Sequence, residues 1–331
     1  MEILCNEYWL PIIFTFLMGL SVLIYVILDG YDLGVGMAMK FANEEQRNVM
    51  LSSIAPFWDA NETWLVLGIG ILLVAFPTAH GIILTSLYLP TVFMLIGIIL
   101  RGASFDFIAK AHADHKSMWS NYFIIGSALA SFSQGYMLGS YINGFKNEIH
   151  YLLFNLLVGI CLSSGYLFVG SGWLIMKTSG ELQKKAISWA RASLWLTACG
   201  ICVVSIVTPL LSERIFEKWF SLPNFFFLLP IPVITCCIVI FIMVILKKLP
   251  LDNDRLCWVP FVSSMFLFFL GFIGLAYSFF PYIVPEKMTI FEAASSADSL
   301  LVILAGVIIV LPLIIIYTII SYKIFWGKAE I

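Results

Sequence analysis

Long runs of apolar residues, separated by short polar segments, follow one another along the whole chain. A helix needs about 20 apolar residues to cross a bilayer. In lipid every backbone polar group must be paired within helices or a closed barrel, and runs this long exclude a barrel. The pattern predicts an all-α membrane protein with nine transmembrane helices, at approximately 9–28, 57–78, 80–101, 119–142, 151–176, 190–212, 224–246, 258–280 and 299–321.

The composition agrees with a single integral membrane domain over residues 1–331. Hydrophobic residues make up 61% of the chain and charged residues 11%, and the mean hydropathy is +0.99. A soluble domain has about 25% charged residues. The start of the chain lacks the basic segment of a cleavable signal peptide. A net charge of −2 without a basic patch argues against a nucleic-acid partner.

Basic residues predict the orientation of the helices, because Lys and Arg gather on the cytoplasmic side of a membrane protein. The segments after odd-numbered predicted helices, together with the C-terminal end, hold 14 of the 18 Lys and Arg residues. The opposite side holds only Lys146, Arg214, Lys218 and Lys287. We therefore expect a periplasmic N-terminus and a cytoplasmic C-terminus.

Acidic residues lie where the first predicted helix reaches the cytoplasm. Asp29 and Asp32 are three residues apart, so they share one face if the helix continues. Gly30 and Gly34 would allow a neighbouring helix to approach closely. An ionisable group in hydrocarbon costs roughly 2.5–3.5 kcal/mol even on the mildest scale. Acids at this position indicate the handling of protons, ions or charged partners.

A second acidic pair begins the second predicted helix, and an arginine ends the third. The residues concerned are Trp58, Asp59, Asn61, Glu62, Trp64, Arg101 and Asp106. In the predicted orientation these helix ends meet at one cytoplasmic rim, which would form a proton or ion entrance with Arg101 keeping one carboxylate ionised. The alternative is that they are ordinary helix-end residues: acids suit the dipole of a helix N-terminus, Arg101 snorkels to the interface, and the tryptophans belong to an interfacial belt.

Haem and metal ligands are not expected in this chain. His80, His112, His115 and His150 all lie outside the middle of the predicted spans. Haem in a helical bundle needs axial His, Met or thiolate ligands within the membrane. No Cys/His spacing resembles a zinc or iron–sulfur site.

Five segments together resemble a known family. They are 29–36 (DGYDLGVG), 56–65 (PFWDANETWL), 101–106 (RGASFD), 132–139 (FSQGYMLG) and 280–296 (FPYIVP followed by TIFEAASS at 289–296). In this order they are similar to the signature segments of subunit II of cytochrome bd quinol oxidase. The segment 132–139 is similar to the cyanide-insensitive branch of that family. The resemblance covers nearly the whole chain.

The resemblance implies nine helices, arranged as two four-helix bundles and one peripheral helix. It implies pairing with a homologous large subunit I that carries haems b558, b595 and d and the quinol-oxidising loop. The complex would oxidise quinol, reduce O2 to water and take the protons from the cytoplasm without pumping. The family also admits a small third subunit and a structural quinone bound in this chain.

The resemblance also assigns residues. The position of Asp59 lies at a cytoplasmic proton entrance in the family, and the position of Trp64 borders a proposed O2 route. Asp29, Asp32 and Glu62 are then candidates for proton relay, and Arg101 would balance their charge. Two departures concern Ala60, where the family commonly has Gly, and the segment around Asp106, where the family varies.

Two other classes of function are compatible with the acids alone. An ion-coupled secondary transporter would bind H⁺ or Na⁺ at them, but such folds show paired broken helices at mid-membrane, and the later helices here lack matching charges. A purely structural membrane subunit would use the acids to orient assembly. Haem d absorption in the purified complex would favour the oxidase.

Overall fold

Helices form almost wherever the apolar runs occur. The computed structural model describes the backbone of residues 2–110, 113–251 and 254–329, and the side chains of all of these except 2–6, 109, 113 and 114. The α-helices are α1 (Glu2–Ala38), α2 (Glu44–Ile54), α3 (Trp58–Ala75), α4 (Pro77–Ser86), α5 (Tyr88–Lys110), α6 (Ala113–Ile142), α7 (Ile149–Lys177), α8 (Gly180–Leu211), α9 (Glu213–Phe220), α10 (Asn224–Leu228), α11 (Pro230–Lys248), α12 (Val259–Phe279), α13 (Ile290–Ala293) and α14 (Ala297–Ile324). A short 3-10 helix (Met39–Phe41) follows α1, and strands β1 (Tyr282–Val284) and β2 (Met288–Thr289) form an antiparallel hairpin.

The expectation of an all-helical membrane protein is confirmed. In the described part of the chain, eight helices are long and apolar enough to cross a membrane: α1, α3, α5, α7, α8, α11, α12 and α14, with α11 extended at its start by α10. The predicted span at 119–142 lies within α6, which is long but less apolar because it carries several serines and Gln134. A ninth crossing therefore stays a prediction.

Helix boundaries differ from the expected ones in two places that matter for the acids. Residues 80–86 belong to the short helix α4 rather than to the third span, because α3 ends at Ala75 and Pro77 starts a new helix at its first position. Helix α1 continues to Ala38, so Asp29 lies nine residues, or about 14 Å, before its end. The first acidic pair is therefore inside the helix and not at its tip.

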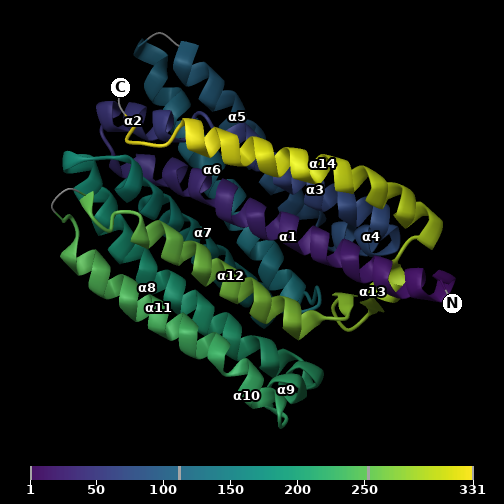
Figure 1. Ribbon diagram of the computed structural model, residues 1–331. Coiled ribbons are helices and arrows are strands. Elements are labelled where there is room, and N and C mark those ends of the chain that lie inside the picture. The colour runs from purple at the N-terminus through teal and green to yellow at the C-terminus, as the bar shows by residue number, and fades with distance from the viewer. Residues whose placement is uncertain (1, 111–112, 252–253, 330–331) are drawn as a thin grey trace.

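Helix α1 is the centre of the arrangement, since it packs against α3, α6, α7, α12 and α14. Helix α14 lies along the outside of the molecule (Figure 1). The start of α1 and the end of α14 lie at opposite ends of the molecule (Figure 1), as an odd number of crossings requires. The β-hairpin and α13 lie at the end that holds the start of α1 (Figure 1).

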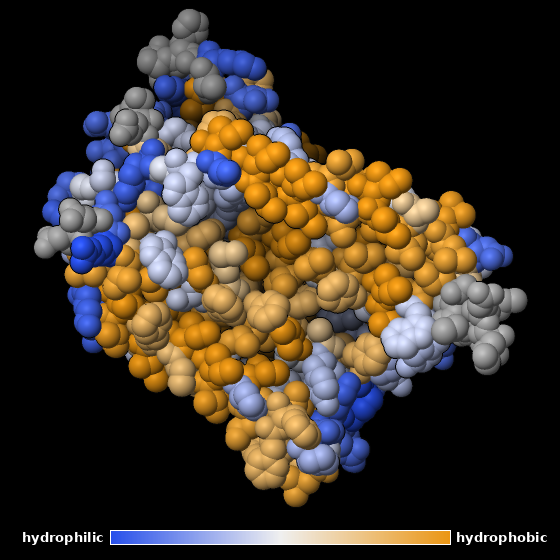
Figure 2. Space-filling model, in the orientation of Figure 1, coloured by the Kyte–Doolittle hydropathy of each residue, from blue (hydrophilic) through white to orange (hydrophobic). Residues whose placement is uncertain are grey.

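The surface has the character of a membrane protein. Figure 2 shows hydrophobic residues across the middle of the face formed by α11, α12 and α14, with hydrophilic residues gathered toward the ends. Large apolar side chains are also exposed along α3 and α5, among them Val66, Leu73, Phe93, Ile96 and Ile99. These faces require lipid or another protein chain as their surroundings.

Glycines let α1 and α7 approach closely, as the sequence predicts for Gly30 and Gly34. A Cβ atom on Gly34 would lie 1.9 Å from the backbone oxygen of Tyr166, and one on Gly30 would lie 2.8 Å from the ring of Tyr166. On the facing helix, a Cβ on Gly170 would meet the backbone of α1 at 2.5 Å. The two backbones therefore pack directly against each other beside the acids of α1.

Gly34→Ala tests this contact. The added methyl group meets backbone that cannot rotate away, so we expect the substitution to destabilise the protein by about 1–3 kcal/mol. The matched control is Gly271→Ala in α12, where a Cβ meets nothing within 4 Å. Thermal unfolding of the purified complex, followed by tryptophan fluorescence, should show a lower melting temperature only for Gly34→Ala. Equal melting temperatures would contradict direct backbone packing.

Candidate functional site

A buried arginine lies where α1, α3 and α5 meet. Arg101 of α5 is 1% exposed, and its Nη1 lies 2.7 Å from Oδ1 of Asp29 in α1. Its Nη2 pairs with the carboxylate of Glu62 in α3. Asp29 is fully buried and Glu62 is 23% exposed. One guanidinium thus holds two carboxylates from two other helices.

A third carboxylate lies on the same face of α1. Asp32 is fully buried, and its Oδ2 accepts a hydrogen bond of 2.8 Å from Nδ2 of Asn61. Asn61 is itself 1% exposed and comes from α3, one residue before Glu62. The cluster of Asp29, Asp32, Glu62 and Arg101 therefore has three acids for one base. If all were ionised it would carry excess negative charge in the protein interior, which is costly, and binding a proton relieves this excess.

The predicted acids separate into a buried group and a surface group. Asp59, in the first turn of α3, is exposed and forms no ion pair with any described residue. It lies one turn before Glu62 on the same helix face. Asp106 in α5 is also exposed and unpaired within the described part of the chain. The expected convergence of the three helix segments is confirmed, since Arg101 contacts both Asp29 and Glu62. Their expected place at helix ends is wrong for Asp29, Asp32 and Arg101, which lie inside the bundle because α1 and α5 continue well beyond them.

The alternative readings of Arg101 and Trp64 do not fit their positions. A snorkelling Arg101 would extend to the surface, whereas its side chain is buried in an ion pair. Trp64 is 2% exposed, so it does not face a lipid interface, and its Nε1 has no hydrogen-bond partner among the described residues. Trp58 is half-buried, with its ring 4.9 Å from that of Phe105.

Three uncharged polar side chains, Tyr25, Gln134 and Tyr166, form a hydrogen-bonded group further along α1 from the acids, and the sequence alone did not predict it. Nε2 of Gln134 in α6 donates to the hydroxyl of Tyr25 in α1, and the hydroxyl of Tyr166 in α7 donates to Oε1 of Gln134, both at 2.7 Å. Tyr25 lies one helical turn from Asp29, on the same face of α1. This spacing is visible in the sequence, but the pairing with α6 and α7 is not.

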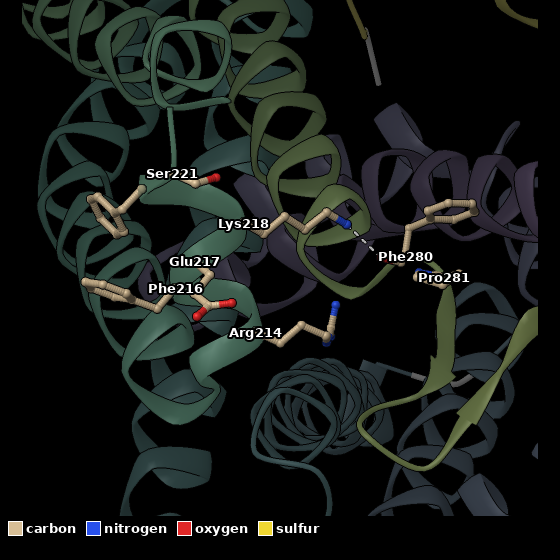
Figure 3. A pocket seen from close by; sticks show the side chains of 8 residues that line it. Arg214, Phe216, Glu217, Lys218, Ser221, Phe280 and Pro281 are labelled. Carbon is tan, nitrogen blue, oxygen red and sulfur yellow. Dashed lines mark hydrogen bonds between the residues drawn. The ribbon is translucent and has the colours of Figure 1, made fainter. Parts of the chain in front are cut away.

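A groove at the opposite end of the molecule is lined by two cations, Arg214 and Lys218, whose role is structural. It has a volume of about 720 Å³ and lies between α9 and the end of α12 (Figure 3). Nζ of Lys218 donates to the backbone oxygens of Tyr277 and Phe280, both at 2.7 Å, and burial lowers the pKa of Lys218. Arg214 donates to the backbone oxygen of Ser278. Both cations therefore bind the carbonyl groups at the end of α12, which leaves the acidic cluster as the candidate site.

Comparisons with known proteins agree on one family. The family described as "Cytochrome bd terminal oxidase subunit II" matches residues 10–325. The chain is 25% identical over 373 aligned positions to "Cytochrome bd-I ubiquinol oxidase subunit 2" of Escherichia coli (strain K12), with 99% of this chain and 95% of that protein covered. It is 30% identical to "Cytochrome bd ubiquinol oxidase subunit 2" of Bacillus subtilis (strain 168), over 56% of this chain and 57% of that one.

The fold is also known from a solved structure. A chain in the structure of bd oxidase from Geobacillus thermodenitrificans superposes with a TM-score of 0.74 at 17% sequence identity. The match covers 96% of this chain and 99% of that one. At this identity the likeness establishes the shared fold.

Arg101→Met tests whether the guanidinium holds the cluster together. Removing one partner of a buried ion pair leaves an uncompensated charge, and we expect a loss of about 3–5 kcal/mol of stability. Thermal unfolding of the purified complex measures this loss. The double variant Asp29→Leu with Arg101→Met removes both buried partners and should recover part of the stability. A single variant as stable as the wild type would contradict the ion pair.

Proposed function

The chain belongs to the family of cytochrome bd terminal oxidase subunit II, and from this premise we propose that it supplies the cytoplasmic proton entrance of its complex. It is a multi-pass protein of the bacterial inner membrane and one subunit of a quinol:O2 oxidoreductase complex that contains subunit I. Family membership favours this function over an ion-coupled transporter. Protons are needed because reduction of O2 to water consumes them.

We place the redox chemistry in the partner. Within the described residues no group of three His, Cys, Asp or Glu side chains gathers as a metal site would. We propose that haems b558, b595 and d are ligated by subunit I. We also propose that residues 1–331 form one membrane domain with nine spans, in which α6 adds to the eight spans named above. These helices would form two four-helix bundles, with α14 at the periphery.

The proposal rests on one observation: the side chains of Asp59, Glu62 and Asp29 are progressively more buried in that order. Asp59 is exposed, Glu62 one turn further is 23% exposed, and Asp29 is fully buried. The last two are joined through the guanidinium of Arg101. Acids ordered from solvent to interior are what a proton needs in order to pass from water to a dry site.

The cluster can bind a proton because it contains more acidic than basic side chains. Arg101 can neutralise one carboxylate fully, whereas Asp29, Asp32 and Glu62 all lie close to it or to one another. A proton taken up by any one of them moves the cluster toward electrical neutrality. The cluster of carboxylates therefore stabilises a bound proton.

The surrounding helices keep the path dry. The exposed apolar faces of α3 and α5 flank the acids, and we propose that subunit I or lipid covers them. Trp64 lies buried two residues after Glu62 on α3, and we propose that it borders the O2 route expected from the family resemblance. An apolar lining of this kind admits O2 and excludes water.

Asp59→Asn and Glu62→Gln test the entrance in the assembled oxidase. Each removes a proton-accepting group, and we expect steady-state O2 consumption to fall by about twofold to tenfold, with the larger effect for the more buried Glu62. The control is Asp106→Asn, which removes an exposed acid of α5 without an ion pair among the described residues. An oxygen electrode measures the rate, and optical spectra report all three haems.

Two outcomes would count against the proposal. Unchanged turnover in both variants would remove Asp59 and Glu62 from proton uptake. Loss of haem absorption would mean that the acids serve assembly. The proposal requires slow turnover with intact haem spectra, together with normal turnover in Asp106→Asn.

A further inference from the structure

A tyrosine of the last helix reaches the acidic cluster. Tyr322 lies in the final turn of α14, and its hydroxyl oxygen is 2.6 Å from that of Tyr31 in α1. Tyr322 is partly exposed, while Tyr31 is fully buried. The pair therefore joins the surface at the end of α14 to the interior beside Asp32, far from Asp59 in the chain.

The hydrogen bonds continue from Tyr31 to the buried carboxylate. Nδ2 of Asn61 donates to the hydroxyl oxygen of Tyr31 at 3.0 Å and to Oδ2 of Asp32 at 2.8 Å. The other carboxylate oxygen of Asp32, Oδ1, is buried and has no hydrogen-bond partner among the described residues. A water molecule in contact with it and with the Tyr31 hydroxyl would complete its hydrogen bonding. When Tyr322 donates to Tyr31, the Tyr31 oxygen already accepts two hydrogen bonds. Its own hydrogen is then free to point toward Asp32.

The hydroxyl groups are not needed to hold α14 in place. The end of α14 and the residues after it are held by three hydrogen bonds to backbone oxygens, each 2.7 Å long. Nζ of Lys177 donates to the oxygen of Phe325, the amide of Ala329 donates to the oxygen of Lys177, and Nζ of Lys328 donates to the oxygen of Thr178. A phenylalanine in place of either tyrosine would keep the packing.

Aromatic side chains pack against both tyrosine rings. The ring of Tyr322 stacks on Phe57 and the ring of Tyr31 stacks on Trp173, each with centroids 4.4 Å apart. Two charged groups face the pair: Asp32 shares the Asn61 amide with Tyr31, and the Lys177 ammonium lies 5.0 Å from the Trp173 ring centre and 5.9 Å from that of Phe57. Buried hydroxyl groups lower stability unless they are hydrogen-bonded. Here the hydrogen bonds connect Tyr322, Tyr31, Asn61 and Asp32 in one continuous chain.

We propose that Tyr322, Tyr31 and Asn61 form a second proton route, which leads from the end of α14 to Asp32. Tyr322 passes its hydroxyl proton to the oxygen of Tyr31 and takes a proton from a hydronium ion at the surface. Tyr31 passes its own proton through one water molecule to the Asp32 carboxylate, which becomes the carboxylic acid. Both tyrosines end neutral, and Asn61 holds the two acceptors in place without transferring a proton.

This route rests on the proposed function of the acidic cluster, since it delivers protons to the same acids. It differs in its starting point: the first route begins at Asp59 in α3, and the second begins at the partly exposed Tyr322. The two routes run in parallel until they reach Asp29 and Asp32. Closing one of them leaves the other open.

Tyr322→Phe and Tyr31→Phe in the assembled oxidase test the second route. We expect each to lower steady-state O2 consumption by about twofold, and the double variant Asp59→Asn with Tyr322→Phe to lower it by more than the product of the single effects. The tyrosine variants should lose more rate as the pH rises, because the supply of protons then limits turnover. The control is Tyr317→Phe, a 59% exposed tyrosine of the same helix, which should match the wild type.

The outcomes separate this route from the proposed function. If both tyrosine variants match the wild type at every pH while Asp59→Asn and Glu62→Gln are slow, the second route is wrong and the first stands. If Asp32→Asn, Asp59→Asn and Glu62→Gln also match the wild type, both are wrong. Loss of haem absorption, or an equal loss of rate at every pH, would assign the tyrosines to structure and overturn the route.

Discussion

The ion pair between Arg101 and Asp29 is the interaction on which the rest of the site depends. Both side chains are withdrawn from solvent, and an unpaired charge at such a position would cost several kcal/mol. The pair therefore requires α1 and α5 to keep one register, because a shift of one turn would leave the buried Asp29 without its counter-charge. Glu62 then joins from α3, so that three helices are held in place by one guanidinium.

Close packing of backbones provides this register. A Cβ atom on Gly126 of α6 would lie 2.7 Å from the oxygen of Gly97 and 2.8 Å from the nitrogen of Arg101, both in α5. On the other side of the cluster, Gly34 brings α1 against the backbone of Tyr166 in α7. The glycines and the charges thus act together: the absence of side chains fixes the helices, and the fixed helices bring Arg101 and Asp29 together. In a membrane, where apolar burial does not drive helix association, small residues take this role.

The sequence was sufficient to find the acids but not to place them. Spacing predicts that Asp29 and Asp32 share a face, and apolar run length predicts most of the spans, because both depend on local periodicity. The sequence predicts Asp29 at a helix end, because the polar residues of the segment 29–38 are typical of one, whereas α1 continues through that segment. The contacts of Gln134 and Tyr322 depend on how helices far apart in the chain pack together, and no local pattern carries that information.

The distribution of charge with depth explains why the site has two kinds of polar residue. The cost of a charge rises toward the middle of a bilayer, so charged side chains are least costly toward the ends of the spanning helices. Asp29 lies nine residues before the end of α1 and Glu62 lies in the second turn of α3, and both pair with Arg101. Further in, Tyr25, Gln134 and Tyr166 form hydrogen bonds without any formal charge. Because it is uncharged, this group can orient Asp29 at little electrostatic cost. Another carboxylate at that depth would need a second arginine. The single guanidinium of Arg101 therefore limits how far the acids can extend into the membrane.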